Sequence, residues 1–449
     1  MKRLLALIVL VVALAACGGG AETPPATEPP PTTVAEEPTQ APEPTATEAA
    51  AEPTSEPAAE EPTTGEPIKI GLLTDQSGAL AIYGPQQENG FRLGLEYATN
   101  GTMQVAGRPI EVIVKDNASD PETAVSQARE LISAEGVDVL VGTVSSGATL
   151  AVMEVAKENE KILIVTPAAS PAITGENFNE FTFRTSRTSV QDALTMGAAL
   201  VELGDTFVQI APDYAFGYGS AMGFYNVVKS LGGQFVINDN DQQFGAIFIP
   251  QDTTDFTTYL NQVLDSGADV LIVTWAGAGF VPLFQQMQQL GIFDEMTVAT
   301  GFGDNQTIAA GYTDAIGAVG VSVYHYTLPD NAVNDWLVQR HKEAFGVPPD
   351  LFTEGGFTAA QMLVAGLEAT GGDTSAAALI PVLEQLRFQG PKGEYIVRPE
   401  DHVMLQPMYL VRLVNTDDPE FRFFELVREF GPEETAPPCQ VPPELNRCP

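Results

Sequence analysis

Two adjacent serines, Ser145 and Ser146, are the residues of this chain whose type and setting first suggest chemistry. They stand in "LVGTVSSGATLAV" (140–152), directly after an apolar run and before a stretch that favours a helix. A serine in such a turn acts either as a nucleophile or as a residue that holds a ligand. Nucleophilic attack needs a general base, usually a histidine, within hydrogen-bond reach.

The rest of the chain lacks the partners that an enzyme would need. Its three histidines, His325, His341 and His402, stand late in the sequence and outside any recognisable catalytic motif. Gly142 and Ser145 do not have the G-x-S-x-G spacing of a nucleophile elbow. The phosphate-binding loop and the zinc-protease motif are missing as well. We therefore expect a binding protein without catalytic residues, cofactor or metal.

A cradle for a carboxylate explains the serine turn better. Free backbone N–H groups and the dipole at the start of a helix favour an anion, and small residues let it approach closely. The next apolar run ends in "VTPAASPAI" (165–173), which adds the N–H groups of Ala168 and Ala169 and the hydroxyl of Ser170. Adjacent parallel strands would bring both loops to one edge of a sheet. The alternative is that both loops are only tight turns between a strand and a helix.

The elements that must position these loops alternate between strand and helix from Ile68 onward. Apolar runs predict strands at 68–74, 110–116, 137–142 and 162–166, and then at 206–212, 233–239, 268–275, 296–300 and 317–326. Amphipathic stretches predict helices between most of them, followed by helices near 331–345, 355–370 and 375–387. Nearly continuous apolar strands are typical of parallel sheets covered on both faces. Two such series predict an α/β fold of two doubly wound lobes, with a ligand at the carboxyl ends of the strands.

The beginning of the chain has a different composition. Residues 1–16 have a positive start and an apolar run shorter than the roughly 20 residues of a spanning helix, which predicts a signal peptide. The end of this segment, "LAAC", resembles the lipobox of bacterial lipoproteins and implies cleavage before Cys17 and lipidation of this cysteine. Residues 17–67, rich in Pro, Thr, Glu and Ala, predict a disordered tether. A glycosylated stalk is the alternative with the same physical role.

The other two cysteines, Cys439 and Cys448, stand in the Pro-rich tail 432–449. Outside the cytoplasm, a lone close pair predicts a disulfide, because a zinc site needs more ligands. The formal net charge of −38 excludes nucleic acid and anionic lipid surfaces as electrostatic partners.

The body from Ile68 to about Val414 resembles the type I periplasmic binding proteins of the branched-chain amino acid transport family. The resemblance rests on "IKIGLLTDQSGALAIYG", "VDVLVGTVSSGATLAV", "ILIVTPAASPAIT", "FTFRTSRTSVQDA" and "APDYAFGYG", in the family's order. It implies two lobes joined by three crossovers, 68–188 with 327–405 and 189–326 with 406–431. The lobes would close on a small solute that passes to the permease and ATPase of an ABC importer. A lipid anchor on Cys17 would hold the protein at the cell membrane.

The resemblance also assigns ligand-binding roles to individual residues. Ser145, Ala168 and Ser170 match the family's carboxylate-binding positions, with Ser146 and Ala169 beside them. Four aromatic residues would complete the site from the mouth of the cleft and from the second lobe: Tyr83, Tyr214, Phe216 and Trp275. Phe216 stands where the family usually has a tyrosine. The alternative for these rings is that they fill the core.

One position departs from the family pattern. Amino-acid binders have an acidic residue after the strand that corresponds to 296–300, where it pairs with the ammonium of the ligand. Gly303 occupies that position here and Asp304 follows it. Burying an ammonium without a partner costs on the order of several kcal/mol. We expect an amino acid, branched-chain or otherwise apolar, if Asp304 reaches the ammonium. The alternatives are an aromatic or aliphatic carboxylic acid, an amide, or a ligand-sensing receptor of the same fold.

Overall fold

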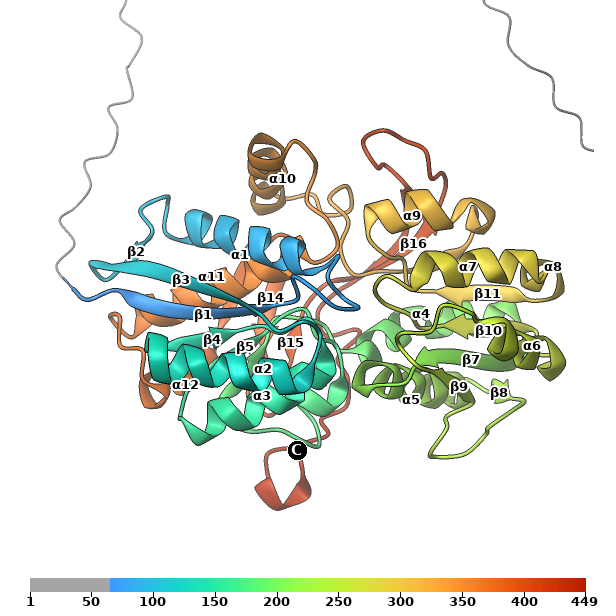
Figure 1. Cartoon of the computed structure of the whole chain (residues 1–449), viewed down its shortest axis with the longest axis horizontal. Coiled ribbons are helices and arrows are strands. Elements are labelled where there is room, and N and C mark those ends of the chain that lie inside the picture. The colour runs from blue at the N-terminus through green and yellow to red at the C-terminus, as the bar shows by residue number, and fades with distance from the viewer. Residues whose placement is uncertain (1–64) are drawn as a thin grey trace, which may run out of the picture. The chain divides into compact units, whose positions relative to one another are not determined.

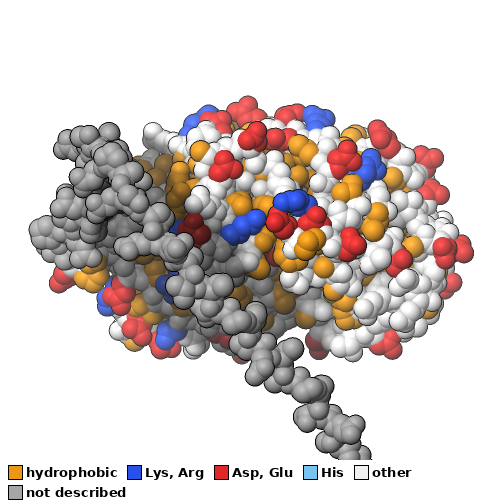
Figure 2. Space-filling model, turned by 90° about the horizontal axis from the view of Figure 1, so that it is seen from above, with side chains coloured by type: hydrophobic (Ala, Val, Ile, Leu, Met, Phe, Trp, Pro, Cys, Tyr) orange, Lys and Arg blue, Asp and Glu red, His pale blue; other side chains and the backbone are white. Residues whose placement is uncertain are grey.

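The computed structural model describes residues 65–449 of the chain (Figure 1). The predicted signal peptide, Cys17 and nearly all of the predicted tether lie outside these described residues. Within them, no helix is both long and apolar enough to cross a membrane. On the face shown in Figure 2, acidic side chains are spread over the surface and do not gather in one patch.

The first sheet has six strands in the order β2-β3-β1-β4-β5-β6. These are β1 (Ile68–Thr74), β2 (Gln104–Val105), β3 (Arg108–Asp116), β4 (Val139–Val141), β5 (Leu163–Val165) and β6 (Thr182–Arg184). All neighbours are parallel except the short edge strand β2. The strands therefore deliver the loops after β1, β4 and β5 to the same edge, as the sequence predicts.

Helices cover both faces of this sheet (Figure 1). One layer contains α1 (Gly84–Ala98) and α11 (Thr353–Ala369), and the other contains α2 (Pro121–Glu130) and α3 (Ser146–Glu158). Because successive strand residues point to opposite faces, Ile70 and Leu72 pack with α1 and α11 while Leu73 packs with α2 and α3. Asp120 caps α2 by accepting from Thr123 N at 2.8 Å, and Pro121 follows it at the first helical position.

The second sheet repeats this architecture with parallel strands in the order β11-β10-β7-β8, and β9 also pairs with β7. Its strands are β7 (Thr206–Pro212), β8 (Gln234–Phe235), β9 (Ala246–Ile249), β10 (Val270–Val273) and β11 (Thr297–Thr300). On one face pack α4 (Ser189–Leu203) and α5 (Ala215–Ser230). On the other pack α6 (Thr257–Ser266) and α7 (Phe280–Gln289), and α8 (Ile292–Glu295) and α9 (Asn305–Gly311) complete this side.

The chain passes between the two α/β units three times, after β6, after β12 and after β15. The last passages place α10 (Ala332–Phe345), α11, α12 (Ala376–Leu383) and the antiparallel strands β13 (Arg387–Gly390), β14 (Gly393–Val397) and β15 (Met404–Leu405) with the first sheet. The antiparallel strands β12 (Val319–Ser322), β16 (Met408–Leu413) and β17 (Phe424–Phe430) pack with the second. We call these two units the first and the second lobe.

The segment after β17 leaves the second lobe and returns to the first. Cys439 and Cys448 form a disulfide in this segment. Arg398 Nη1 donates to Pro437 O at 2.7 Å, and Arg447 Nε donates to Glu400 O at 2.9 Å. The tail therefore adds a non-covalent link between the lobes beside the three chain passages.

Candidate ligand-binding site

Two cavities lie between the lobes, at the edge where the parallel strands of both sheets end. Their volumes are about 30 Å³ and about 80 Å³. They share the lining residues Tyr83, Arg187, Phe216, Ala276 and Phe352, so they are two parts of one space, which we call the cleft. The smaller part lies against the turns after β4 and β5, and the larger part lies against the loops after β10 and β11.

The structure brings most of the predicted ligand-binding residues together in this cleft. Those that line it are Tyr83, Ser146, Ala168, Ala169, Tyr214, Phe216 and Trp275. They come from both lobes and from positions that lie far apart in the sequence. The cleft is therefore the site to which the sequence pattern points.

The other three predicted residues, Ser145, Ser170 and Asp304, do not line this cleft, although Ser170 lines a larger neighbouring cavity of about 530 Å³ between the lobes. Each of their side chains caps the start of a helix. Ser145 Oγ accepts from Ala148 N at 3.4 Å at the start of α3, and Ser170 Oγ accepts from Ala172 N at 3.4 Å. Asp304 accepts from the backbone N–H groups of the first turn of α9 and from a threonine hydroxyl at 2.6 Å. Short polar side chains after a strand are good caps, and each of these three caps a helix in the structure.

The expected free N–H groups of the cradle are occupied within the protein. Ala168 N donates to Thr143 O at 3.3 Å, and the N–H groups of Ala169 and Ser170 donate to Ser146 Oγ at 3.2 and 3.1 Å. Ser146, rather than Ser145, is thus the serine at the cleft. Its hydroxyl connects the turn after β4 to the turn after β5.

A fully buried arginine holds this part of the wall in place by binding backbone carbonyl oxygens. Arg184, at the end of β6, donates to Ala168 O at 2.7 Å, to Ser170 O at 2.9 Å and to Arg187 O at 3.1 Å. Burial lowers the pKa of Arg184 to about 9, so the guanidinium stays protonated at neutral pH. Because one rigid group binds several carbonyl oxygens, the first-lobe wall is formed before any ligand arrives.

Arg187 and Asp192 are the charged residues that line the cleft, and neither is among the residues predicted from the sequence to bind the ligand. Arg187 lies in the first passage between the lobes, is 7% exposed and lines both cavities. Its Nε and Nη2 bind the carboxylate of Asp192 at 3.2 and 3.0 Å. Its Nη1 donates to no group among the described residues. In the sequence "RTSRTSVQD", this cation and acid stand close together between the two sheets, a pattern that suits a structural ion pair equally well.

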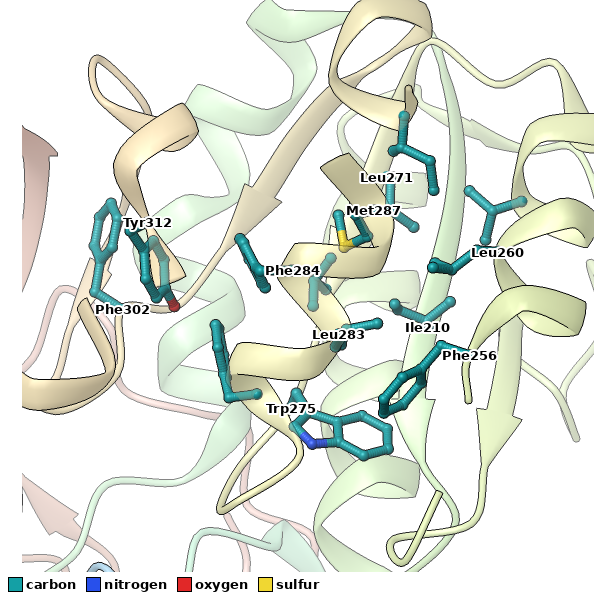
Figure 3. Packing of buried hydrophobic residues seen from close by; sticks show 14 of the residues in the cluster. Ile210, Phe256, Leu260, Leu271, Trp275, Leu283, Phe284, Met287, Phe302 and Tyr312 are labelled. Carbon is teal, nitrogen blue, oxygen red and sulfur yellow. The ribbon is translucent and has the colours of Figure 1, made fainter. Parts of the chain in front are cut away.

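The second-lobe wall is aromatic. Phe216, Phe224, Trp275, Phe280 and Phe302 line the larger cavity (Figure 3 shows Trp275 and Phe302). Trp275 meets Phe256 edge to face at a centroid distance of 5.2 Å, and Phe280 stacks on Tyr312 at 5.1 Å. These rings pack in the core of the second lobe and also line the cleft. The two alternatives for the aromatic residues, core packing and a place in the ligand site, therefore do not exclude each other.

Direct contacts between the walls show that the structure is a closed form. Gly277 N, after β10, donates to Tyr83 Oη at 3.0 Å, and Ala278 N donates to Ala79 O at 3.2 Å. A Cβ on Gly277 would lie 2.2 Å from Ala79 O, and its φ of +83° also suits glycine.

Asp350 of the first lobe makes a further contact across the cleft, because its carboxylate accepts from Asn305 N at 3.1 Å. Burial and the neighbouring Asp304 raise the pKa of Asp350 to about 7. This carboxyl group therefore titrates near neutral pH in the closed form.

The comparisons with known proteins agree with this architecture. The sequence model of the periplasmic binding protein family matches residues 67–418. The chain therefore belongs to the periplasmic binding protein family, and its fold is the type I fold of that family.

Individual relatives point in the same direction. A Leu/Ile/Val-binding protein homolog of Brucella abortus (strain 2308) is 24% identical over 363 residues, 78% of this chain and 88% of the relative. A solved ABC-type branched-chain amino acid transporter from Rhodopseudomonas palustris is 36% identical, covers 84% of this chain and 100% of its own, and superposes with a TM-score of 0.69. A solute-binding protein from R. palustris, solved with benzoate, is 25% identical over 82% of this chain and 97% of its own, with a TM-score of 0.71.

Proposed function

We propose that this protein captures a small carboxylate-bearing solute between its lobes and delivers it to the permease of an ABC importer. The observation that carries this proposal is Arg187, a buried guanidinium on the wall of both cavities. Asp192 occupies two of its donors, and Nη1 is left for a ligand. A guanidinium binds a carboxylate with strong, oriented hydrogen bonds.

The charges around the cleft favour an acid that carries no ammonium group. Of the described residues that line the two cavities, Asp192 is the one carboxylate, and it is already paired with Arg187. Asp304, the expected partner of an ammonium, caps α9, and the uncharged Gly303 lines the cavity instead. Burying an unpaired ammonium is costly. An apolar aliphatic or aromatic carboxylic acid therefore fits the wall better than an amino acid.

An amino acid is the second candidate, and the relatives favour it. Several relatives are Leu/Ile/Val-binding proteins or their homologues, and the solved protein at 36% identity is a branched-chain amino acid transporter. Two other solved relatives at 25% identity hold benzoate and 3,4-dihydroxybenzoic acid. An amino acid would need Asp192 to turn from Arg187 toward the ammonium of the ligand.

The mechanism is binding by closure, without a chemical step. The ligand would contact Arg187 and Ser146 at one end and the aromatic wall of the second lobe at the other. Only a ligand that touches both walls shifts the lobes toward the closed form. The histidines are engaged elsewhere: His325 with Phe421 O, His341 with Val347 O and His402 with Thr182 O.

The experiment that tests the proposal is a thermal-shift comparison of matched solutes on the intact protein. Leucine and 4-methylpentanoate share a carbon skeleton and differ in the amino group, and so do phenylalanine and 3-phenylpropanoate. At 100 times its dissociation constant, a ligand stabilises the folded state by about 2.7 kcal/mol. We expect the acids without an amino group to raise the melting temperature more. If only the amino acids stabilise, the second candidate is correct, and if no carboxylate stabilises, the proposal fails.

Anchoring to the membrane through Cys17 is part of the same proposal. It rests on the lipobox sequence, which lies outside the described residues. An anchored binding protein on the outer side of the cell membrane would stay close to its permease. A Cys17→Ser variant that remained in the membrane fraction would refute this part without affecting the ligand site.

A further inference from the structure

Two carboxylates from opposite lobes meet at the start of α9. Asp350, in the loop before α11 of the first lobe, accepts from Asn305 N with both of its oxygens, at 3.1 and 3.2 Å. Asp304 of the second lobe accepts from Thr307 N at 3.1 Å and from Thr307 Oγ1 at 2.6 Å. Closure of the lobes therefore brings both carboxylates to one helical turn.

The surroundings of Asp350 depend on this contact between the lobes. Opening would carry Asn305 and Asp304 away with the second lobe and expose the carboxyl group to water. The other bonds of Asp350 lie within the first lobe: its carboxylate accepts from Leu351 N at 2.7 Å, and its own N–H donates to Thr353 Oγ1 at 3.1 Å. The loop can thus keep its shape while the environment of its carboxyl group changes.

The charges around Asp350 are mostly neutralised by other partners. The titratable and charged groups on the surrounding elements are Asp304 before α9, Tyr83 after β1, Glu88 and Arg92 in α1, Arg187 in the first passage, Tyr324 after β12, His341 in α10 and Glu354 in α11. Glu88 pairs with Arg92, Arg187 pairs with Asp192, and Glu354 accepts from Thr358 Oγ1. Burial raises the pKa of both tyrosines and lowers that of His341, so these three are uncharged at neutral pH. Asp304 is the neighbouring charge that acts on Asp350 most strongly.

The two forms of the protein should therefore bind protons differently. Burial, and after it the charge of Asp304, raise the pKa of Asp350 to about 7 in the closed form. Both causes disappear on opening, so this pKa should return to its ordinary value of about 4. Between these two pH values the closed form holds a proton that the open form lacks. Falling pH then favours the closed form, and rising pH through 7 disfavours it.

We propose that closure of the lobes takes up a proton at Asp350, and that the contact between Asp350 and the start of α9 makes ligand binding sensitive to pH. This inference rests on the proposed binding by closure. A protonated Asp350 keeps a carbonyl oxygen as acceptor for Asn305 N and no longer repels Asp304. A more acidic medium thus favours capture of the solute, and a more alkaline one favours its release.

Isothermal titration of the intact protein tests this inference. The titrants are 4-methylpentanoate and leucine, neither of which changes its charge appreciably between pH 6 and 8. At pH 7, titration in PIPES and in imidazole counts the protons taken up, because the two buffers ionise with different enthalpies. We expect about half a proton per bound ligand at pH 7, and an affinity about tenfold higher at pH 6 than at pH 8.

Two variants assign the proton to the contact between the lobes. Asp350→Asn keeps an oxygen that accepts from Asn305 N and cannot take up a proton, so both the uptake and the pH dependence should vanish. Asp304→Asn removes the neighbouring charge and keeps a good helix cap, so the uptake at pH 7 should fall. The second variant leaves Asp350 in place and decides the matter if the first does not fold.

The matched control is Asp75→Asn. Burial raises the pKa of Asp75 to about 6, so this carboxyl group also titrates near neutral pH. The groups that act on it, Ser119, Asn117 and Asp116, all belong to the first lobe, so closure should not change its proton binding. Its replacement should leave the proton uptake of ligand binding as it is in the wild type.

The outcomes separate the inference from the function on which it rests. If a titrant binds without proton uptake and with equal affinity at pH 6 and 8, the inference is overturned, while the proposed function stands. An uptake that persists in Asp350→Asn, or that is unchanged in Asp304→Asn, also overturns it. If neither titrant binds at any of these pH values, the proposed carboxylate site fails, and the inference fails with it.

Discussion

The two walls of the cleft are built on opposite principles. The first-lobe wall consists of short turns whose polar groups are almost all paired within the protein, by helix caps, by Ser146 Oγ and by Arg184. The second-lobe wall consists largely of aromatic rings, among them Phe216, Trp275 and Phe302. Arg187 stands between them in the chain and retains an unpaired Nη1 within the described residues. The first wall is thus a rigid support, and specificity is expected from Arg187 and the second wall.

The contrast between the two walls depends most on the rigidity of the first-lobe wall. We expect Arg184 to provide this rigidity. Arg184→Met keeps the length of the side chain but leaves several buried carbonyl oxygens without a donor. We expect a loss of about 3–5 kcal/mol in the free energy of unfolding, measured by urea denaturation.

The matched control is Arg92→Met, in α1 of the same lobe. Arg92 pairs with Glu88 and its side chain is 49% exposed, so its replacement should change stability by less than about 0.5 kcal/mol. If both substitutions lowered the free energy of unfolding equally, the hydrogen bonds of the buried Arg184 would not be what stabilises the first-lobe wall.

A smaller effect is expected where the two walls meet. Tyr83→Phe removes the hydrogen bond from Gly277 N and keeps the edge-to-face contact with Phe352 at 4.7 Å. Because this bond joins the two lobes, we expect ligand affinity to fall about fivefold, or about 1 kcal/mol, with little change in unfolding. Isothermal titration measures the affinity. Tyr225→Phe, whose hydroxyl bonds to Asp239 away from the cleft, is the control, and an equal loss there would refute the closure role.

The fold follows from the sequence further than the site does. Long apolar runs predicted most of the central strands correctly, and the predicted strand 68–74 coincides with β1. The predicted strand at 233–239 is reduced to Gln234–Phe235, and the predicted helix at 375–387 ends at Leu383, after which 387–390 pair with β14. Pairing between distant segments, which no local pattern encodes, decides such boundaries.

The sequence predicted the loops of the site and most of the side chains that line the cleft, but not the position of every polar side chain. Ser145, Ser170 and Asp304 have the residue type that suits a ligand, and the same type suits a helix cap, which is what the structure makes of them. Ser146, their neighbour, reaches the cleft instead. The role of Arg187 becomes visible only from the three-dimensional position of the passage between the lobes. Its local sequence does not distinguish a structural ion pair with Asp192 from an ion pair at a ligand site.

The central claim is that Arg187 binds the carboxylate of the solute in the closed cleft. The most direct test is isothermal titration of the double variant Arg187→Gln/Asp192→Asn, which removes both charges and leaves no buried carboxylate unpaired. The titrant is the acid that stabilises the wild type most in the thermal-shift comparison. The exposed pair Arg129 and Glu158, replaced by Gln and Asn respectively, is the control. We predict that affinity falls at least about 100-fold in the cleft variant, with the fold intact, and stays unchanged in the control. An affinity within about threefold of the wild type in the cleft variant would contradict the account.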